Sequence, residues 1–135
     1  MALVARFGLK CIDIRGADCS LAELVGDFVY LVGPPVGGRD QVRKVDPSDV
    51  LKMPAVGVII NKLTDTFCQV QWMGETPAIF ESLTTGKPHY VGPDARVTGA
   101  VPISPTGLFA QIVGLATSPT RFYVRPENHM TRLQR

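Results

Sequence analysis

Residues 67–73 read Phe-Cys-Gln-Val-Gln-Trp-Met and carry the clearest alternation of polar and apolar side chains in the chain. Successive side chains of a strand point to opposite faces of a sheet, so a period of two predicts a β-strand with one buried face. Phe67, Trp72 and either Gln69 or Val70 compete for that face. One strand cannot bury its apolar face alone, so the segment predicts a sheet around it.

Short apolar segments of the same kind recur on both sides of this strand. The 135 residues include 13 Gly and 11 Pro. Because these residues interrupt regular secondary structure, so many of them favour short strands and turns over long helices. The predicted strands are residues 28–32, 41–45, 55–61, 67–73, 77–80, 88–91, 95–98, 109–116 and 121–125. The pattern predicts an all-β fold, either a small closed barrel or a sandwich of short strands.

Helical structure is expected only as two short turns. One is at 20–25, where Ser20 and Glu23 have the spacing of a capping box. The other is at 46–52, where Pro47 suits the first helical position. Neither is long enough to found a helical domain.

A weak internal repeat divides the chain into two halves. Gly26–Leu31 matches Gly86–Val91, since in both a tyrosine follows the glycine by four residues inside a predicted strand. Farther along, Gly57 and Gly114 each lie within an apolar strand, where a glycine marks a bulge, a bend or a close backbone approach. Strand-rich sequences also produce such matches by chance. If the repeat is genuine, two similar β units pack around one core.

The chain is predicted to form a single β-rich domain over residues 1–135. Residues 1–20 are assigned to an extended N-terminal arm or edge strand, because Ala2–Ile14 is apolar with scattered charge. Residues 21–126 form the β body, and residues 127–135 form an extended C-terminal tail.

Composition excludes several classes of function. Charged residues are only 19% of the chain against 45% hydrophobic, which rules out a disordered polyelectrolyte. The net charge of +2 is too small for a dedicated nucleic-acid binder, and no direct nucleic-acid contact is expected. The longest apolar run, Ala55–Ile60, is far too short to cross a membrane. An apolar chain with so little charge favours a protein partner that covers part of its surface.

No arrangement of residues typical of catalysis, cofactor binding or metal binding stands out, and we expect no enzyme, no cofactor and no metal. Thr85–Pro88 resembles the end of a phosphate-binding loop but lacks its required glycine and hydroxyl. His89 and His129 have no second ligand at a metal-binding spacing. A pocket around His89 and Tyr90 would instead favour a small β-barrel enzyme or ligand carrier.

The three cysteines, Cys11, Cys19 and Cys68, form no disulfide framework. Buried free thiols are expected, with a Cys11–Cys19 bridge as the alternative in an oxidising setting.

Four arginines near the C-terminus are the candidate partner-binding residues. They are Arg121, Arg125, Arg132 and Arg135, with Glu127 as the one acidic residue among them. The segment either is a solvated tail or docks on an acidic surface of a partner. Residues 121–125 also combine two cations with two aromatic rings, the pattern of a single-strand-binding barrel.

A segment in the second half of the chain resembles a sequence motif that recurs in structural proteins of tailed bacteriophages. The motif matches residues 84–98, Thr-Thr-Gly-Lys-Pro-His-Tyr-Val-Gly-Pro-Asp-Ala-Arg-Val-Thr. Gln-Ile-Val-Gly-Leu-Ala-Thr-Ser-Pro-Thr at 111–120 and Gly26–Tyr30 extend the resemblance to about residues 24–126. The chain is similar to small capsid decoration (cement) proteins and to related head- and tail-fibre modules. Ala95 stands where a glycine usually follows the aspartate, which leaves the type of that turn open.

The resemblance implies a virion structural protein, made in the host cytoplasm, that binds the mature capsid surface. There it would stabilise contacts between subunits of the major capsid protein, as a homo-oligomer with a trimer favoured. The alternative within the virion is a tail, collar or fibre component. The alternative from another class is the small β-barrel ligand-binding protein or enzyme.

Overall fold

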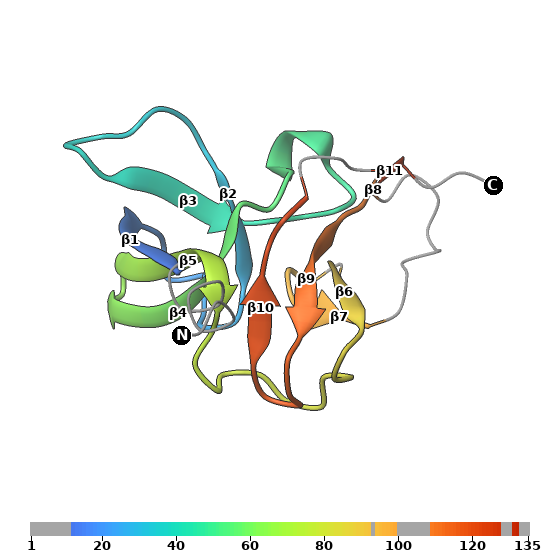
Figure 1. Ribbon diagram of the computed structural model, residues 1–135. Helices are drawn as coiled ribbons and strands as arrows, with labels where there is room; N and C mark the ends of the chain where they lie inside the picture. The colour runs from blue at the N-terminus through green and yellow to red at the C-terminus, as the bar shows by residue number, and fades with distance from the viewer. Residues whose placement is uncertain (1–11, 93, 100–108, 128–130, 133–135) are drawn as a thin grey trace.

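The computed structural model describes residues 12–92, 94–99, 109–127 and 131–132, and it is all-β as predicted (Figure 1). One 3-10 helix, η1 (Val50–Lys52), interrupts the strands. The strands are β1 (Asp13–Asp18), β2 (Phe28–Leu31), β3 (Asp40–Lys44), β4 (Gly57–Thr64), β5 (Phe67–Glu75), β6 (Pro88–Val91), β7 (Val97–Thr98), β8 (Phe109–Ala110), β9 (Ile112–Ala116), β10 (Phe122–Val124) and β11 (Thr131–Arg132).

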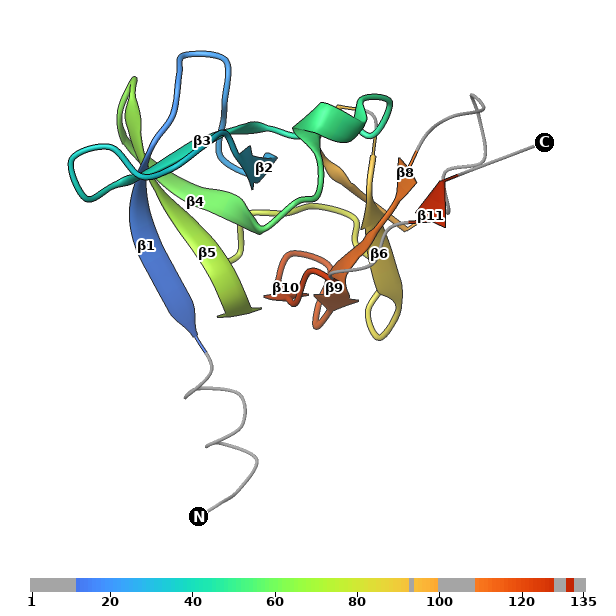
Figure 2. The same cartoon turned by 90° about the horizontal axis from the view of Figure 1, so that it is seen from above.

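The first five strands close into a barrel, in the order β1-β3-β2-β4-β5 (Figure 2). Closure comes from β1, which pairs in parallel with β3 and antiparallel with β5. The barrel interior is filled by small apolar side chains and two thiols: Ala17, Cys19, Val29, Val42, Ile59, Cys68 and Val70. Within residues 67–73 it is therefore Cys68 and Val70 that face this interior, while Phe67 is half-buried. Of the two predicted architectures, a closed barrel or a sandwich, the structure shows the closed barrel, with further strands beside it.

A second, open unit repeats the pairing of the first. Its order β7-β6-β9-β10 corresponds to β3-β2-β4-β5 of the barrel. The registers agree residue for residue, since Val29 pairs with Gly57 as His89 pairs with Gly114. The two halves recognised in the sequence are therefore two β units with the same strand pairing.

The last residues of β5 join the two units. Gly74, with φ of 100°, lets β5 leave the barrel so that Gly74 and Glu75 pair with β10. Nε2 of Gln71 donates to the carbonyl oxygens of Met73 (3.1 Å) and Glu75 (3.0 Å), which holds this bend. One strand thus belongs to both units.

The main hydrophobic core lies between the units. Phe28 and Val58 on the outside of the barrel pack with Phe122, Val124 and Val91 of the second unit. The rings of Phe28 and Phe122 meet edge to face at 6.1 Å between centroids, a favourable aromatic geometry.

Polar contacts reinforce this core at its edges. Arg96 pairs with the buried carboxylate of Asp27 at 2.8 Å. The side-chain amide of Gln111 makes two hydrogen bonds, of 2.8 and 2.9 Å, to the backbone of Ala55. The side chains of Arg96 and Gln111 thereby tie the second unit to the barrel.

Several local expectations are corrected by the structure. Residues 77–80 are not a strand, because Pro77 has no N–H for a ladder and Phe80 turns inward onto Phe122. The Glu23 carboxylate does accept from the N–H of Ser20 at 2.7 Å, as in a capping box, and also from the Ser20 hydroxyl at 2.6 Å. The N–H of Glu23 donates to the backbone carbonyl of Ser20, so the two residues close a turn rather than a helix.

The second expected helical turn is shorter than predicted. The 3-10 helix is capped by Asp49, whose side chain accepts from the N–H of Leu51, so Pro47 is not its first residue.

The two segments predicted as arms are paired in part within the chain. Residues 13–18 of the expected N-terminal arm or edge strand form β1. This strand pairs with a neighbour on both sides as part of the barrel wall, so it is not an edge strand. Residues 131–132 of the expected C-terminal tail pair with β8. Residues 1–11, 128–130 and 133–135 lie outside the described residues.

Ala95 adopts the left-handed conformation that glycine usually takes. Its φ is 69° and its side chain is fully buried. Its carbonyl oxygen accepts from the N–H of Phe28 at 2.8 Å, so the turn is fixed by contact with the barrel. The substitution noted in the sequence therefore retains a glycine-like turn.

We predict that Gly114→Val destabilises the protein by about 3 kcal/mol or more. A Cβ at Gly114 would collide with the carbonyl oxygen of Tyr123, and its φ of 153° is strained for other residues. Gly57→Val should cost a similar amount, since a Cβ there lies 2.6 Å from the carbonyl oxygen of Gln71. Gly33→Val is the control, because nothing lies within 4 Å of its added Cβ. Urea unfolding measures all three, and wild-type stability in the Gly114 and Gly57 variants would contradict the tight approach.

Cys19 and Cys68 are buried free thiols, as predicted, and Cys11 lies outside the described residues. The Cys11–Cys19 alternative therefore stays untested. Burial raises the pKa of the Cys68 thiol from its ordinary value of 9.0 to about 12, and Cys19 beside it adds to the shift. Within the barrel this thiol stays protonated in alkaline solution.

The free energy of unfolding should fall as the pH rises from about 9 toward 12. The unfolded thiol loses its proton above pH 9 while the folded one keeps it, so deprotonation favours unfolding. Between pH 8 and 10.5 we expect wild type to lose about 1–2 kcal/mol more than Cys68→Ala in urea unfolding. Equal losses in the two proteins would show that the Cys68 thiol titrates normally.

Candidate partner-binding surface

Equivalent rows of side chains on the two units differ sharply in burial. On the barrel, the cross-strand row is Phe28–Val58–Gln71, and all three are fully buried, with Phe28 and Val58 packed against the second unit. On the second unit, the equivalent row is Pro88–Leu115–Tyr123. Pro88 is exposed, Leu115 is 41% exposed and Tyr123 is half-buried. The second unit thus presents to solvent an apolar row whose counterpart is core.

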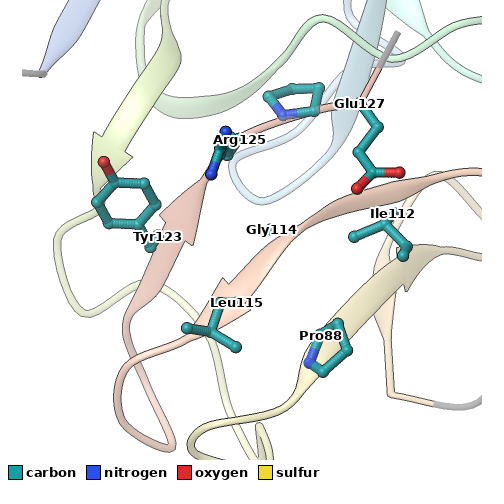
Figure 3. Close-up of a pocket in the computed structure, with 8 residues that line it drawn as sticks. Pro88, Ile112, Gly114, Leu115, Tyr123, Arg125 and Glu127 are labelled. Carbon is teal, nitrogen blue, oxygen red and sulfur yellow. The ribbon is translucent and has the colours of Figure 1, made fainter. Parts of the chain in front are cut away.

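A groove of about 810 Å³, named groove A, runs along this exposed row (Figure 3). Ile112 and Gly114 of β9 also line it. Apolar walls come from Pro88, Leu115 and Tyr123. Arg125 and Glu127 place one charge of each sign on its rim. Apolar walls with charged residues at the rim are the anatomy of a protein interface.

A second hollow of about 650 Å³, named groove B, lies on the other side of Tyr123. Its walls include Ile12 and Ile14, which are 41% and 43% exposed. Gln71 also lines it, and its buried Oε1 has no hydrogen-bond partner among the described residues. Glu75 accepts a 2.6 Å hydrogen bond from the hydroxyl of Thr117 at this edge.

The structure brings two of the four predicted partner-binding arginines to this surface. Strand alternation puts Phe122 and Val124 inside and leaves Arg121, Tyr123 and Arg125 on the outer side. Arg121 lines groove B and Arg125 lines groove A. Both side chains are exposed, and neither makes an ion pair within the described part of the chain.

The other two predicted arginines are not placed at this surface. The backbone of Arg132 lies in β11, paired with Phe109. Arg135 lies outside the described residues.

His89 is a core residue. It is 1% exposed, and its ring meets the ring of Phe122 edge to face at 5.7 Å. Its Nδ1 lies 2.8 Å from the carbonyl oxygen of Lys87, and its Nε2 accepts from the N–H of Thr84 at 3.4 Å. Neither groove A nor groove B is lined by His89 or Tyr90. The pocket that would favour an enzyme or ligand carrier is thus not formed by either groove.

The described ranges contain no cluster of three or more His, Cys, Asp or Glu side chains that could hold a metal ion. None of the helices found there has the length and apolar character needed to span a bilayer. Comparison of the sequence with models of known protein families and with curated proteins finds no match.

Pro88, Leu115 and Tyr123 were not recognised as surface residues from the sequence. The repeat contained the signal, because Pro88 and Leu115 follow Gly86 and Gly114 at the same distances at which Phe28 and Val58 follow Gly26 and Gly57. What the repeat could not show is that one unit would cover the other.

Proposed function

We propose that this chain is a virion structural protein of a tailed bacteriophage that binds the mature capsid surface and stabilises contacts between major capsid subunits. The observation that carries the proposal is the pair of exposed arginines, Arg121 and Arg125, on either side of the half-buried Tyr123, which lies between two grooves with apolar walls. Arginine and tyrosine are enriched where proteins bind each other. The resemblance over about residues 24–126 supplies the class of partner.

Groove B and Arg121 are the proposed contact with the capsid. A barrel closed by β1 and tied to the second unit offers a firm body for clamping neighbouring subunits. Each bound copy then favours the assembled shell by mass action.

A tail, collar or fibre component is the second candidate, because the same grooves could attach the chain to those parts. A single-strand-binding role draws on the two cations around Tyr123. It is disfavoured by Glu75 and Glu127, which line the same two grooves and would repel phosphates.

Quantitative mass spectrometry of purified virions tests this function. We predict hundreds of copies, near a simple ratio to the major capsid protein. About a dozen copies would instead indicate the collar, tail or fibre, and absence from particles would refute the virion role.

The proposed contact is tested by Arg121→Glu added to particles that lack the protein. Reversing this charge replaces attraction by repulsion at the interface, so we expect a tenfold or greater loss of binding. Lys44→Glu, the same reversal at an exposed position on β3, is the matched control. Equal binding by both variants would place the capsid contact elsewhere on the molecule.

A further inference from the structure

We propose that copies of this chain associate head to tail, with the tip of the β2–β3 hairpin of one copy seated in groove A of the next. This self-association would occur in solution and does not depend on the virion role.

The hairpin tip is an uncharged apolar projection. All eight residues from 31 to 38, Leu-Val-Gly-Pro-Pro-Val-Gly-Gly, are exposed, and Val36 is 63% exposed. The segment projects from the barrel in both views (Figures 1 and 2). Leu31, Val32 and Val36 together place three exposed apolar side chains on this projection, and grouped apolar exposure is typical of interaction sites.

The tip is also a defined turn rather than a loose loop. Val36 and Arg39 exchange backbone hydrogen bonds of 2.9 and 3.1 Å. Gly37 and Gly38 both have positive φ, 61° and 80°, as a type I′ hairpin turn requires. Little conformational entropy would be lost on docking, which favours binding.

The lining of groove A suits this tip in chemistry. Proline-rich segments dock on aromatic side chains, and the groove offers Tyr123 to Pro34 and Pro35. Its Leu115 wall would cover Val36.

Charges flanking the two surfaces are complementary. Asp40 follows the tip and Arg125 stands on the groove rim, and neither side chain makes an ion pair within the described part of the chain. Arg39, the other charge beside the tip, is already paired with Asp18 of its own chain at 3.1 Å. A register that sets Asp40 against Arg125 therefore adds an ion pair between the two copies.

The placement of the two surfaces selects the second copy as the occupant. In Figures 1 and 2 the tip lies at the left and strands β6 and β9 lie to the right, so a tip cannot reach the groove of its own chain. Repeated head-to-tail contacts either close into a ring or propagate as a filament. A single tip covers less than the roughly 800 Å² per partner of a standard interface, and a ring offsets this by giving each copy two contacts.

Complementation between two variants tests the arrangement. Val36→Asp removes the tip and Leu115→Asp removes the groove, and each variant alone should be monomeric where wild type is oligomeric by light scattering. An equimolar mixture retains one intact tip and one intact groove, so it should form a heterodimer and nothing larger. Leu51→Asp, at an 81% exposed position on the 3-10 helix, is the control and should assemble like wild type.

Circular dichroism confirms that each variant is folded, and Pro88→Asp replaces Leu115→Asp if the latter is not. The proposal is overturned if wild type is monomeric at 100 µM or higher, or if both variants still assemble. A mixture that stays monomeric would also overturn it, because it indicates that like surfaces meet in the wild-type contact. None of these results depends on capsid binding.

Discussion

The burial of the barrel's outer row under the second unit is the constraint on which the rest of the structure depends. Phe28 and Val58 are fully buried there, and Phe28 meets Phe122 of the second unit edge to face. An open sheet of four short strands has no core of its own, because its inner face needs apolar cover. The barrel provides that cover, so the second unit is stable only as part of the whole.

That packing also explains why the functional surface lies where it does. Because the two units have the same strand pairing, each carries an equivalent row of side chains. The second unit covers the row on the barrel, and the row on the second unit stays uncovered. The side chains of the uncovered row, Pro88–Leu115–Tyr123, are largely apolar although the row faces solvent. With Arg121 and Arg125 beside it, this row separates the two grooves that we assign to partners.

The sequence predicted most of the strands and the two-unit repeat, because those depend on local pattern. The positions of Gly57 and Gly114 were informative, because a close backbone approach leaves no room for a Cβ atom and therefore requires glycine. Interactions distant in the chain were not predictable. Nothing local shows that residues 13–18 close a barrel against β5, or that Phe80 leaves a strand-like segment to fill the core. Of the candidate site, Arg121 and Arg125 were found from charge, but the grooves arise only from packing between elements.

A double-mutant cycle between Phe28 and Phe122 tests most directly the claim that the barrel and the second unit form one body. The free energy of unfolding would be measured for Phe28→Leu, Phe122→Leu and the double variant. Residues in contact are energetically coupled, and we predict a coupling of about 1 kcal/mol within a single cooperative transition. The half-buried Phe67, which packs over Gly16 on the barrel, provides the control pair with Phe122, and its effect should be additive. Additive effects of Phe28 and Phe122, or two separate unfolding transitions, would contradict the account.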